Sequence, residues 1–218
     1  LDCLANFSSE KNEFSLLQMI SHTLEMRPLI RTKQKEMDFV HNELGKRYEY
    51  LLEEEPSSFD MEYGEFVNSI KTALFFEEWI SEKGEDFLLE TFGSRPGEIR
   101  AKVENANWLL YSAEELSKVT RNLHAAKELR KLRLRIKHGV HEELLPLLRL
   151  KGIGKKRARK MFNNNVKNVG DVKTVDVVTL SQLVGGKVAQ SIKEQVGITV
   201  KEVPDGKNKR QLGLGKFT

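Results

Sequence analysis

The chain has 218 residues, of which 39% are hydrophobic and 31% are charged, and its formal net charge is +4. This length accommodates one large domain or two smaller ones, each with its own core. No apolar run reaches the roughly 18–20 residues that a bilayer-spanning helix needs, so the sequence argues against a membrane protein.

The N-terminal residue is Leu1 rather than Met, and no signal-peptide pattern follows it. A single cysteine, Cys3, rules out an internal disulfide bond. We therefore expect a cytoplasmic protein. The missing Met also suggests a fragment of a longer protein.

Charge is divided unevenly along the chain. Residues 1–98 contain 10 Lys and Arg against 21 Asp and Glu, a balance of −11, whereas residues 99–218 contain 26 against 11, a balance of +15. This asymmetry suggests that the second half meets a polyanion. Attraction between the two halves explains the charges alone equally well.

The first 140 residues are predicted to be almost wholly helical, because Gly and Pro are sparse and apolar residues recur at helical spacing. Asp60 is the expected cap of a helix that runs to about Lys83. A long helix is expected from Pro96 to about Val119, with the proline in its first turn.

A further helix over residues 121–138 is expected to end at Gly139 as a left-handed cap. From there on the helices are short and glycines become frequent. We therefore predict an all-α protein with a helical bundle (residues 1–138), a small second domain (139–197) and a polar, basic tail (198–218) that is expected to be flexible.

The second domain contains the run LKGIGKKRA, which starts at Leu150 and is the helix-hairpin-helix signature. Gly152 and Gly154 permit a sharp turn and leave no Cβ between the backbone and a phosphate. Ile153 is expected to pin the turn to the core, and Ala158 to let the helices approach closely. The N–H groups after Gly154 then form an anion site.

Basic side chains surround this turn. They would contact DNA phosphates without reading base sequence, and such binding weakens as salt rises. The alternative is a tight turn with a solvated basic face. The candidate DNA contacts are Gly152, Ile153, Gly154, Lys155, Lys156, Arg157, Arg159 and Lys160.

A second glycine turn lies within residues 183–192 (LVGGKVAQSI) and carries less charge. It is either the second half of a paired hairpin unit or, as we favour from the residues, a helix start that only completes the fold.

Several runs, in order, resemble the C-terminal region of the archaeal Hjm/HelQ-type DNA-repair helicases, in the Ski-two-like branch of superfamily two. These runs are KTAL from Lys71 with Trp79 and Ile80, PGEIR from Pro96 with Val103, Glu104, Trp108 and Leu109, and residues 135–162 around the glycine turn. The resemblance covers about residues 13–197.

The resemblance implies a helical bundle whose long "ratchet" helix, here residues 96–119, lies across the translocating single strand. It also implies a terminal helix-hairpin-helix domain in which Arg157 and Arg159 match an Arg-x-Arg signature. Trp108, off the apolar stripe, becomes the candidate for stacking on a base, which is worth ~1–3 kcal/mol. Packing against another domain is the alternative for this Trp.

One position departs from the family. Some relatives carry an Arg seven residues before this Trp, where this chain has Ala101. Its neighbours Arg100 and Lys102 are candidate replacements for that contact with the strand.

The motor itself is missing from this sequence. It contains no Gly-x-x-x-x-Gly-Lys-Ser/Thr loop, so ATP and Mg²⁺ are expected only in motor domains outside this chain, and no cofactor within it. The histidines and Cys3 show no metal-ligand spacing, and no metal site is predicted.

The end of the chain fits Gln-x-x-Leu-x-x-Phe and resembles the peptides that bind sliding clamps. A chance match in a disordered tail is the alternative. The residues concerned are Gln211, Leu214 and Phe217.

The preferred hypothesis is the DNA-handling part of an ATP-dependent 3′→5′ repair helicase, with single-stranded and branched DNA and the helicase's own motor and winged-helix domains as partners. One alternative is a stand-alone helix-hairpin-helix module that holds DNA and recruits a clamp. Another is a helical scaffold whose basic face meets an acidic protein.

Overall fold

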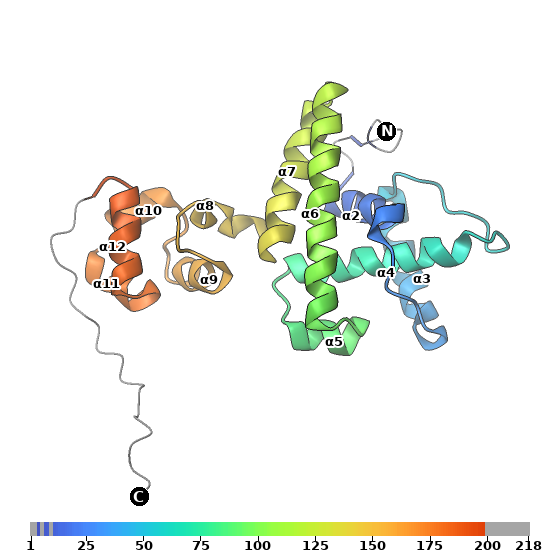
Figure 1. Cartoon of the computed structure of the whole chain (residues 1–218), viewed down its shortest axis with the longest axis horizontal. Coiled ribbons are helices and arrows are strands. Elements are labelled where there is room, and N and C mark those ends of the chain that lie inside the picture. Colours follow the sequence, from blue (N-terminus) through green and yellow to red (C-terminus); the bar gives the residue numbers. More distant parts are fainter. Residues whose placement is uncertain (1–3, 5–6, 9–10, 199–218) are drawn as a thin grey trace, which may run out of the picture. The chain divides into compact units, whose positions relative to one another are not determined.

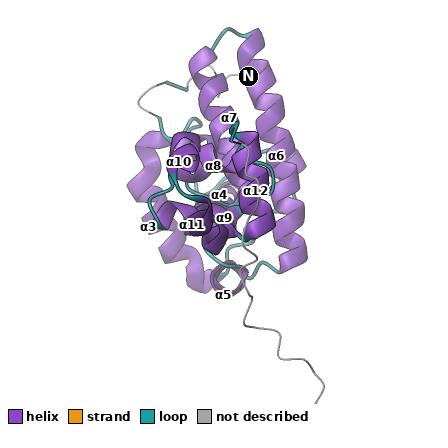
Figure 2. Cartoon of the chain, turned by 90° about the vertical axis from the view of Figure 1, so that its left-hand side faces the viewer, coloured by secondary structure: helices purple, strands orange, loops and turns teal. Residues whose placement is uncertain are grey.

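The structure, a computed structural model, describes Leu4, residues 7–8 and residues 11–198. All regular elements within these ranges are helices, which confirms the predicted all-α fold (Figure 2). The chain divides into two compact units, Leu1–Glu142 and Glu143–Thr218.

The first unit is built from six described α-helices and three short 3-10 turns. The helices are α2 (Glu13–Ser21), α3 (Met37–Arg47), α4 (Tyr63–Ile80), α5 (Glu85–Phe92), α6 (Pro96–Val119) and α7 (Leu123–His138), and the turns are η1 (Leu24–Met26), η2 (Gln34–Glu36) and η3 (Tyr48–Tyr50).

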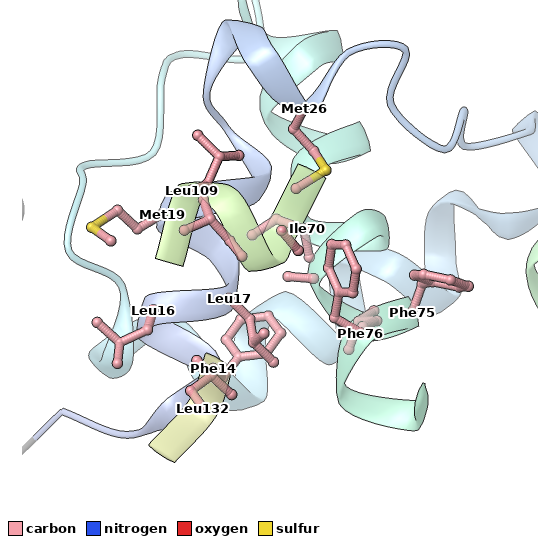
Figure 3. Close-up of a cluster of buried hydrophobic side chains, with 14 of the residues drawn as sticks. Phe14, Leu16, Leu17, Met19, Met26, Ile70, Phe75, Phe76, Leu109 and Leu132 are labelled. Atoms are coloured by element: carbon pink, nitrogen blue, oxygen red, sulfur yellow. The ribbon is translucent and has the colours of Figure 1, made fainter. Parts of the chain in front are cut away.

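The central helix of this unit is α4, because it is buried along most of its length. Its fully buried side chains include Phe66, Phe75 and Phe76, and the helix packs against α2, α3, α5 and α7. Figure 3 shows side chains of α2, α4, α6 and α7 meeting in one continuous apolar cluster. Burial of this area is the main stabilising term of the unit.

Helix α4 begins later than the sequence predicts. Its N-cap is Glu62 and it ends at Ile80, short of Lys83. The predicted cap, Asp60, instead accepts a 2.9 Å hydrogen bond from the Ser57 N–H in the preceding turn. A short Asp side chain satisfies a turn N–H as readily as a helix N–H, so the predicted cap was wrong by two residues.

Helices α6 and α7 form a long antiparallel pair (Figure 1). Helix α6 spans Pro96–Val119 as predicted, and Glu98 accepts a 2.9 Å hydrogen bond from the Arg95 N–H at its start. Helix α7 ends at Gly139, which adopts φ +62°. These local signals determine the length of the pair.

The second unit consists of short helices that follow the 3-10 turn η4 (Glu142–Leu144). They are α8 (Leu145–Leu148), α9 (Lys155–Asn163), α10 (Val169–Thr174), α11 (Val177–Val184) and α12 (Gly186–Gln195).

Helix α9 packs on α11, and α11 pairs with α12 around a small apolar core. Lys193 of α12 is also buried: its ammonium donates hydrogen bonds to the carbonyls of Lys173 and Val175 at the end of α10. Burial lowers the pKa of Lys193. This lysine therefore closes the C-terminus of α10 rather than facing a ligand.

Candidate nucleic-acid interface

The first glycine turn joins α8 to α9 and has the geometry that the sequence predicts at Gly152 and Ile153. Gly152 has φ +86°, a conformation that L-residues rarely adopt. Ile153 is buried, and its N–H donates a 3.2 Å hydrogen bond to the Leu150 carbonyl. The turn is therefore anchored from its inner side.

Gly154 serves a different purpose from Gly152. Its φ of −108° is available to any residue, so no conformational demand selects glycine there. A Cβ at this position would meet nothing within 4 Å, and no side chain caps α9. The first-turn N–H groups of a helix lack intrahelical acceptors, so this end of α9 presents partial positive charge to solvent.

The basic residues of α9 do not form one patch. Arg157 turns back and donates a 2.9 Å hydrogen bond to the Gly152 carbonyl, which brings its charge to the turn. Arg159 lies on the other flank of the helix, where it pairs with Glu143 at 2.6 Å and stacks over Phe162. The Arg-x-Arg pair is thus divided between two faces.

The other basic residues of α9 also differ in their contacts and in their exposure. Lys160 donates a 2.8 Å hydrogen bond to the Gln182 carbonyl at the end of α11. Lys156 is exposed at the centre of the solvent face, and Lys155 is half-buried beside it. Within this group, Lys156 and Arg157 are the cations best placed to meet a phosphate at the turn.

The second glycine turn lies beside the first. Gly185 has φ +92° and opens α12, and a Cβ on Gly152 would lie 3.8 Å from Val188 in the first turn of that helix. The side-chain amide of Gln195 completes the contact by bonding both the N–H (2.8 Å) and the carbonyl (3.2 Å) of Lys151. The two turns therefore form one surface, which also carries the exposed Lys187.

In the first unit, Trp108 lies at the centre of the solvent face of α6 and is 55% exposed. Tyr111, one turn later, is 47% exposed and lies under the Arg133 guanidinium, 5.3 Å from the ring centroid. Large aromatic side chains are usually buried, so two adjacent exposed rings on one helix indicate a binding surface. Their faces suit stacking on bases.

The predicted cations of α6 separate onto its two flanks. Arg100 is exposed and lies on the Tyr111 side. Lys102 lies on the opposite side, where its ammonium donates a 2.5 Å hydrogen bond to the Pro28 carbonyl and burial lowers its pKa. Lys102 thus holds another segment of the chain. Its predicted contact with a strand stays a prediction.

The sequence also led us to expect no membrane span and no metal site, and a clamp-binding peptide at the end of the chain. No described helix is long and apolar enough to cross a membrane. The described residues contain no group of three or more His, Cys, Asp and Glu that could hold a metal ion. The clamp-peptide residues Gln211, Leu214 and Phe217 lie outside the described residues, and their role stays a prediction.

Comparison with known families matches residues 14–139 to the family described as "Archaeal helicase, domain 4". The match covers more than half of the chain and the α2–α7 unit described above. The chain belongs to the archaeal helicase domain 4 family.

A second match, to a SAM-like helix-hairpin-helix tandem, covers residues 144–197. Both glycine turns fall inside it. The paired hairpin, which sequence reasoning weighed as the less favoured explanation of the second turn, therefore describes this unit. The predicted fold of a bundle followed by a helix-hairpin-helix domain is confirmed.

Curated relatives of this domain 4 chain carry the name "ATP-dependent DNA helicase Hel308". The protein from Pyrococcus horikoshii is 32% identical over 208 residues, covering 93% of this chain and 28% of the relative. Those from Pyrococcus abyssi and Methanococcus vannielii are each 33% identical, covering 92% and 84% of this chain and 28% and 23% of the relatives. The chain spans less than a third of the length of these relatives.

Proposed function

We propose that this chain is the strand-handling part of an ATP-dependent 3′→5′ DNA helicase that acts in replication-coupled repair in the cytoplasm. The observation that carries the proposal is Trp108, more than half exposed at the centre of the 24-residue helix α6 in a helicase-family domain. The length that the relatives have in addition to this chain favours a part of a helicase over a stand-alone clamp-recruiting module.

Two surfaces of the chain suit single-stranded and branched DNA. On α6, Trp108 and Tyr111 offer ring faces on which bases of any sequence stack, each worth ~1–3 kcal/mol. On the hairpin tandem, the open N-terminus of α9 and Arg157 offer hydrogen bonds and charge to the phosphate backbone. Neither surface presents a set of groups arranged to read base edges.

ATP and Mg²⁺ belong, in this proposal, to motor domains outside the chain. The glycine turn between α11, which ends at Val184, and α12, which begins at Gly186, is too short to wrap the phosphates of a nucleoside triphosphate. No step of ATP hydrolysis is therefore assigned to this chain. The strand would pass from the motor over α6, and the hairpin tandem would grip the emerging strand or slow the motor.

The test is a fluorescence-anisotropy titration of the 218-residue chain with a labelled single-stranded oligonucleotide at several salt concentrations. Arg157→Ala should weaken binding to all sequences and flatten the plot of log K against log salt by about 0.7, the value for one contact with a single strand. Lys127→Ala, which removes an exposed lysine from α7, is the matched control. No binding by the unaltered chain, or equal salt slopes for Arg157→Ala and Lys127→Ala, would contradict the proposal.

A further inference from the structure

A segment without regular structure, residues 27–33, links η1 to η2 and is called the strap here. Helix α4 holds its backbone through three side chains: Thr72 accepts from the Ile30 N–H (3.1 Å), Asn68 accepts from the Thr32 N–H (2.7 Å), and Lys71 donates to the Arg31 carbonyl (3.0 Å). These three hydrogen bonds hold consecutive main-chain groups of the strap against α4, so the backbone conformation of the strap is fixed.

Helix α6 holds the other edge of the same segment. Lys102 donates to the Pro28 carbonyl, and Asn105 donates a 3.3 Å hydrogen bond to the carbonyl of Glu25 in η1. Met26, which precedes the strap, is buried, and Figure 3 shows its side chain in the core beside α6. The backbone faces inward in this arrangement, and the strap's arginine side chains are exposed.

The strap and its flanking residues, together residues 26–35, are strongly basic in an acidic part of the chain. Residues 26–35 contain no Asp or Glu, although residues 1–98 contain 21 acidic residues against 10 basic ones. Four of those ten basic residues fall in this stretch, which marks it as a deliberate concentration of charge. They are Arg27, Arg31 and Lys33 of the strap and Lys35 of η2.

The two strap arginines differ in their surroundings. Arg27 forms an ion pair with Glu65 of α4. Within the described part of the chain, the Arg31 side chain has no acidic partner and makes no hydrogen bond, and it is exposed. Of the two strap arginines, Arg31 is therefore the one that is available to an anion.

A cavity of about 360 Å³ opens between the strap and the first half of α6. Three cations line it, Arg27, Arg31 and Lys102, against one carboxylate, Glu98. One oxygen of Glu98 already accepts a hydrogen bond from the backbone N–H at the start of α6. The short side chain of Ala101 leaves the cavity open on the helix side.

The cavity and Trp108 lie along the same face of α6. Ala101 and Trp108 are seven residues apart, which is almost two full turns, so they point in nearly the same direction about 10 Å apart along the axis. A cationic cavity in line with an exposed aromatic ring is the combination by which proteins hold single-stranded nucleic acid.

We propose that the strap and α6 form a phosphodiester-binding subsite, in which Arg31 contacts the backbone of the strand that stacks on Trp108. The ligand is the phosphodiester of single-stranded nucleic acid, and the subsite rests on the proposed function of α6. The grip of α4 and α6 on the strap's main chain holds Arg31 in place before the strand arrives, which reduces the ordering cost of binding.

The test compares three variants of the full chain in salt-dependent titrations with an oligo-dT strand. Arg31→Ala should weaken binding several-fold and flatten the salt slope by about 0.7. Arg130→Ala removes an exposed arginine of α7 that has no ion pair or hydrogen bond within the described part of the chain, and it should leave the slope unchanged. Trp108→Ala should weaken binding without changing the slope, because stacking releases no counterions.

The outcomes separate the two proposals. Equal binding by Arg31→Ala and Arg130→Ala, with Trp108→Ala still weakened, would overturn the strap subsite and leave the strand on α6. If Trp108→Ala alone has no effect, the strand does not stack on Trp108, and both the proposed function of α6 and the subsite as stated are overturned. Unchanged binding in Trp108→Ala, Arg157→Ala and Arg31→Ala together would overturn both the subsite and the proposed function.

A second measurement distinguishes a strand from a free anion. The backbone amide signals of Ala101 and Lys102 in NMR spectra should shift saturably with oligo-dT, and inorganic phosphate at the same phosphate concentration should not shift them. Saturable shifts with inorganic phosphate and none with oligo-dT would assign a free-anion site and overturn the proposal.

Discussion

The Trp79 ring covers Gly139 at the C-terminus of α7. A Cβ on Gly139 would lie 2.7 Å from the Cε2 atom of the ring, and the indole N–H donates a 2.7 Å hydrogen bond to the Ile136 carbonyl. Gly139 also has φ +62°. Glycine is thus required here twice, by the backbone conformation and by the ring of a residue sixty positions away.

Gly139→Ala should destabilise the chain by about 2–4 kcal/mol, because it adds steric overlap with Trp79 to the strain of a left-handed alanine. Gly93→Ala is the matched control: Gly93 has φ +72° but open space around it, so it should cost only about 1 kcal/mol. Urea unfolding measures both. Equal decreases in the free energy of unfolding for the two variants would show that the Trp79 ring does not constrain Gly139.

His22 should make stability depend on pH. Its Nδ1 lies 2.5 Å from a carboxylate oxygen of Glu53, and this hydrogen bond raises the His22 pKa despite partial burial. The folded state therefore holds this proton above the pH at which the unfolded state releases it. The stabilisation should be complete below about pH 6.5 and should fall as pH rises through the folded pKa.

Urea unfolding across pH 5.5–8.5 would measure this slope, and Glu53→Gln should abolish it, because Glu53 is the main cause of the raised His22 pKa and burial opposes it. His22→Gln serves as the control, because it removes the titrating group altogether. A slope that is the same in all three proteins would assign the pH dependence to other groups.

Lys71→Met should destabilise the first unit by about 1–3 kcal/mol. Lys71 is buried, and its ammonium bonds both Glu36 at 2.8 Å and the Arg31 carbonyl, so the methionine removes the ion pair with Glu36 and the hydrogen bond to the Arg31 carbonyl. Lys33→Met, at an exposed position of the same segment, should stay within about 0.5 kcal/mol of the unaltered chain. Thermal unfolding compares them, and similar melting temperatures would argue against a structural role for Lys71.

The two glycines of the first hairpin turn should separate folding from binding. Gly152→Ala places alanine at φ +86° and should cost about 1–2 kcal/mol of stability. Gly154→Ala should cost about 0.5–1 kcal/mol, yet should weaken DNA binding more than Gly152→Ala does, because it adds a Cβ in open space at the N-cap of α9, where the phosphate is proposed to approach. Urea unfolding and anisotropy titrations on both variants test this. Unaltered DNA binding by Gly154→Ala would contradict a phosphate contact at the N-terminus of α9.

Local signals in the sequence predicted the pair α6 and α7 well. Pro96 and Gly139 are strong, context-free markers of a helix start and a helix end, and both act as expected. Asp60 failed as a marker because a turn and a helix start compete for the same carboxylate. Such competition is decided by neighbouring residues and not by the residue type.

The candidate site was predictable only where one segment defines it. The glycine turn at Gly152 is local, and its geometry followed from the motif. Arg159 and Lys102 bond Glu143 and the Pro28 carbonyl, groups that only the folded chain brings near, and their predicted contacts with DNA stay predictions. For the strap, the sequence offers one indication, the run of basic residues without Asp or Glu over residues 26–35. The position of the strap along α6 depends on tertiary contacts that the sequence does not reveal.

The most direct test of a strand on α6 is intrinsic tryptophan fluorescence during titration with oligo-dT. Trp108 is exposed and Trp79 is partly buried with its N–H bonded to Ile136, so Trp108 should dominate the response. We predict quenching that saturates with binding in the unaltered chain and disappears in Trp108→Phe. Binding detected by anisotropy with no quenching, or quenching that persists in Trp108→Phe, would contradict the account.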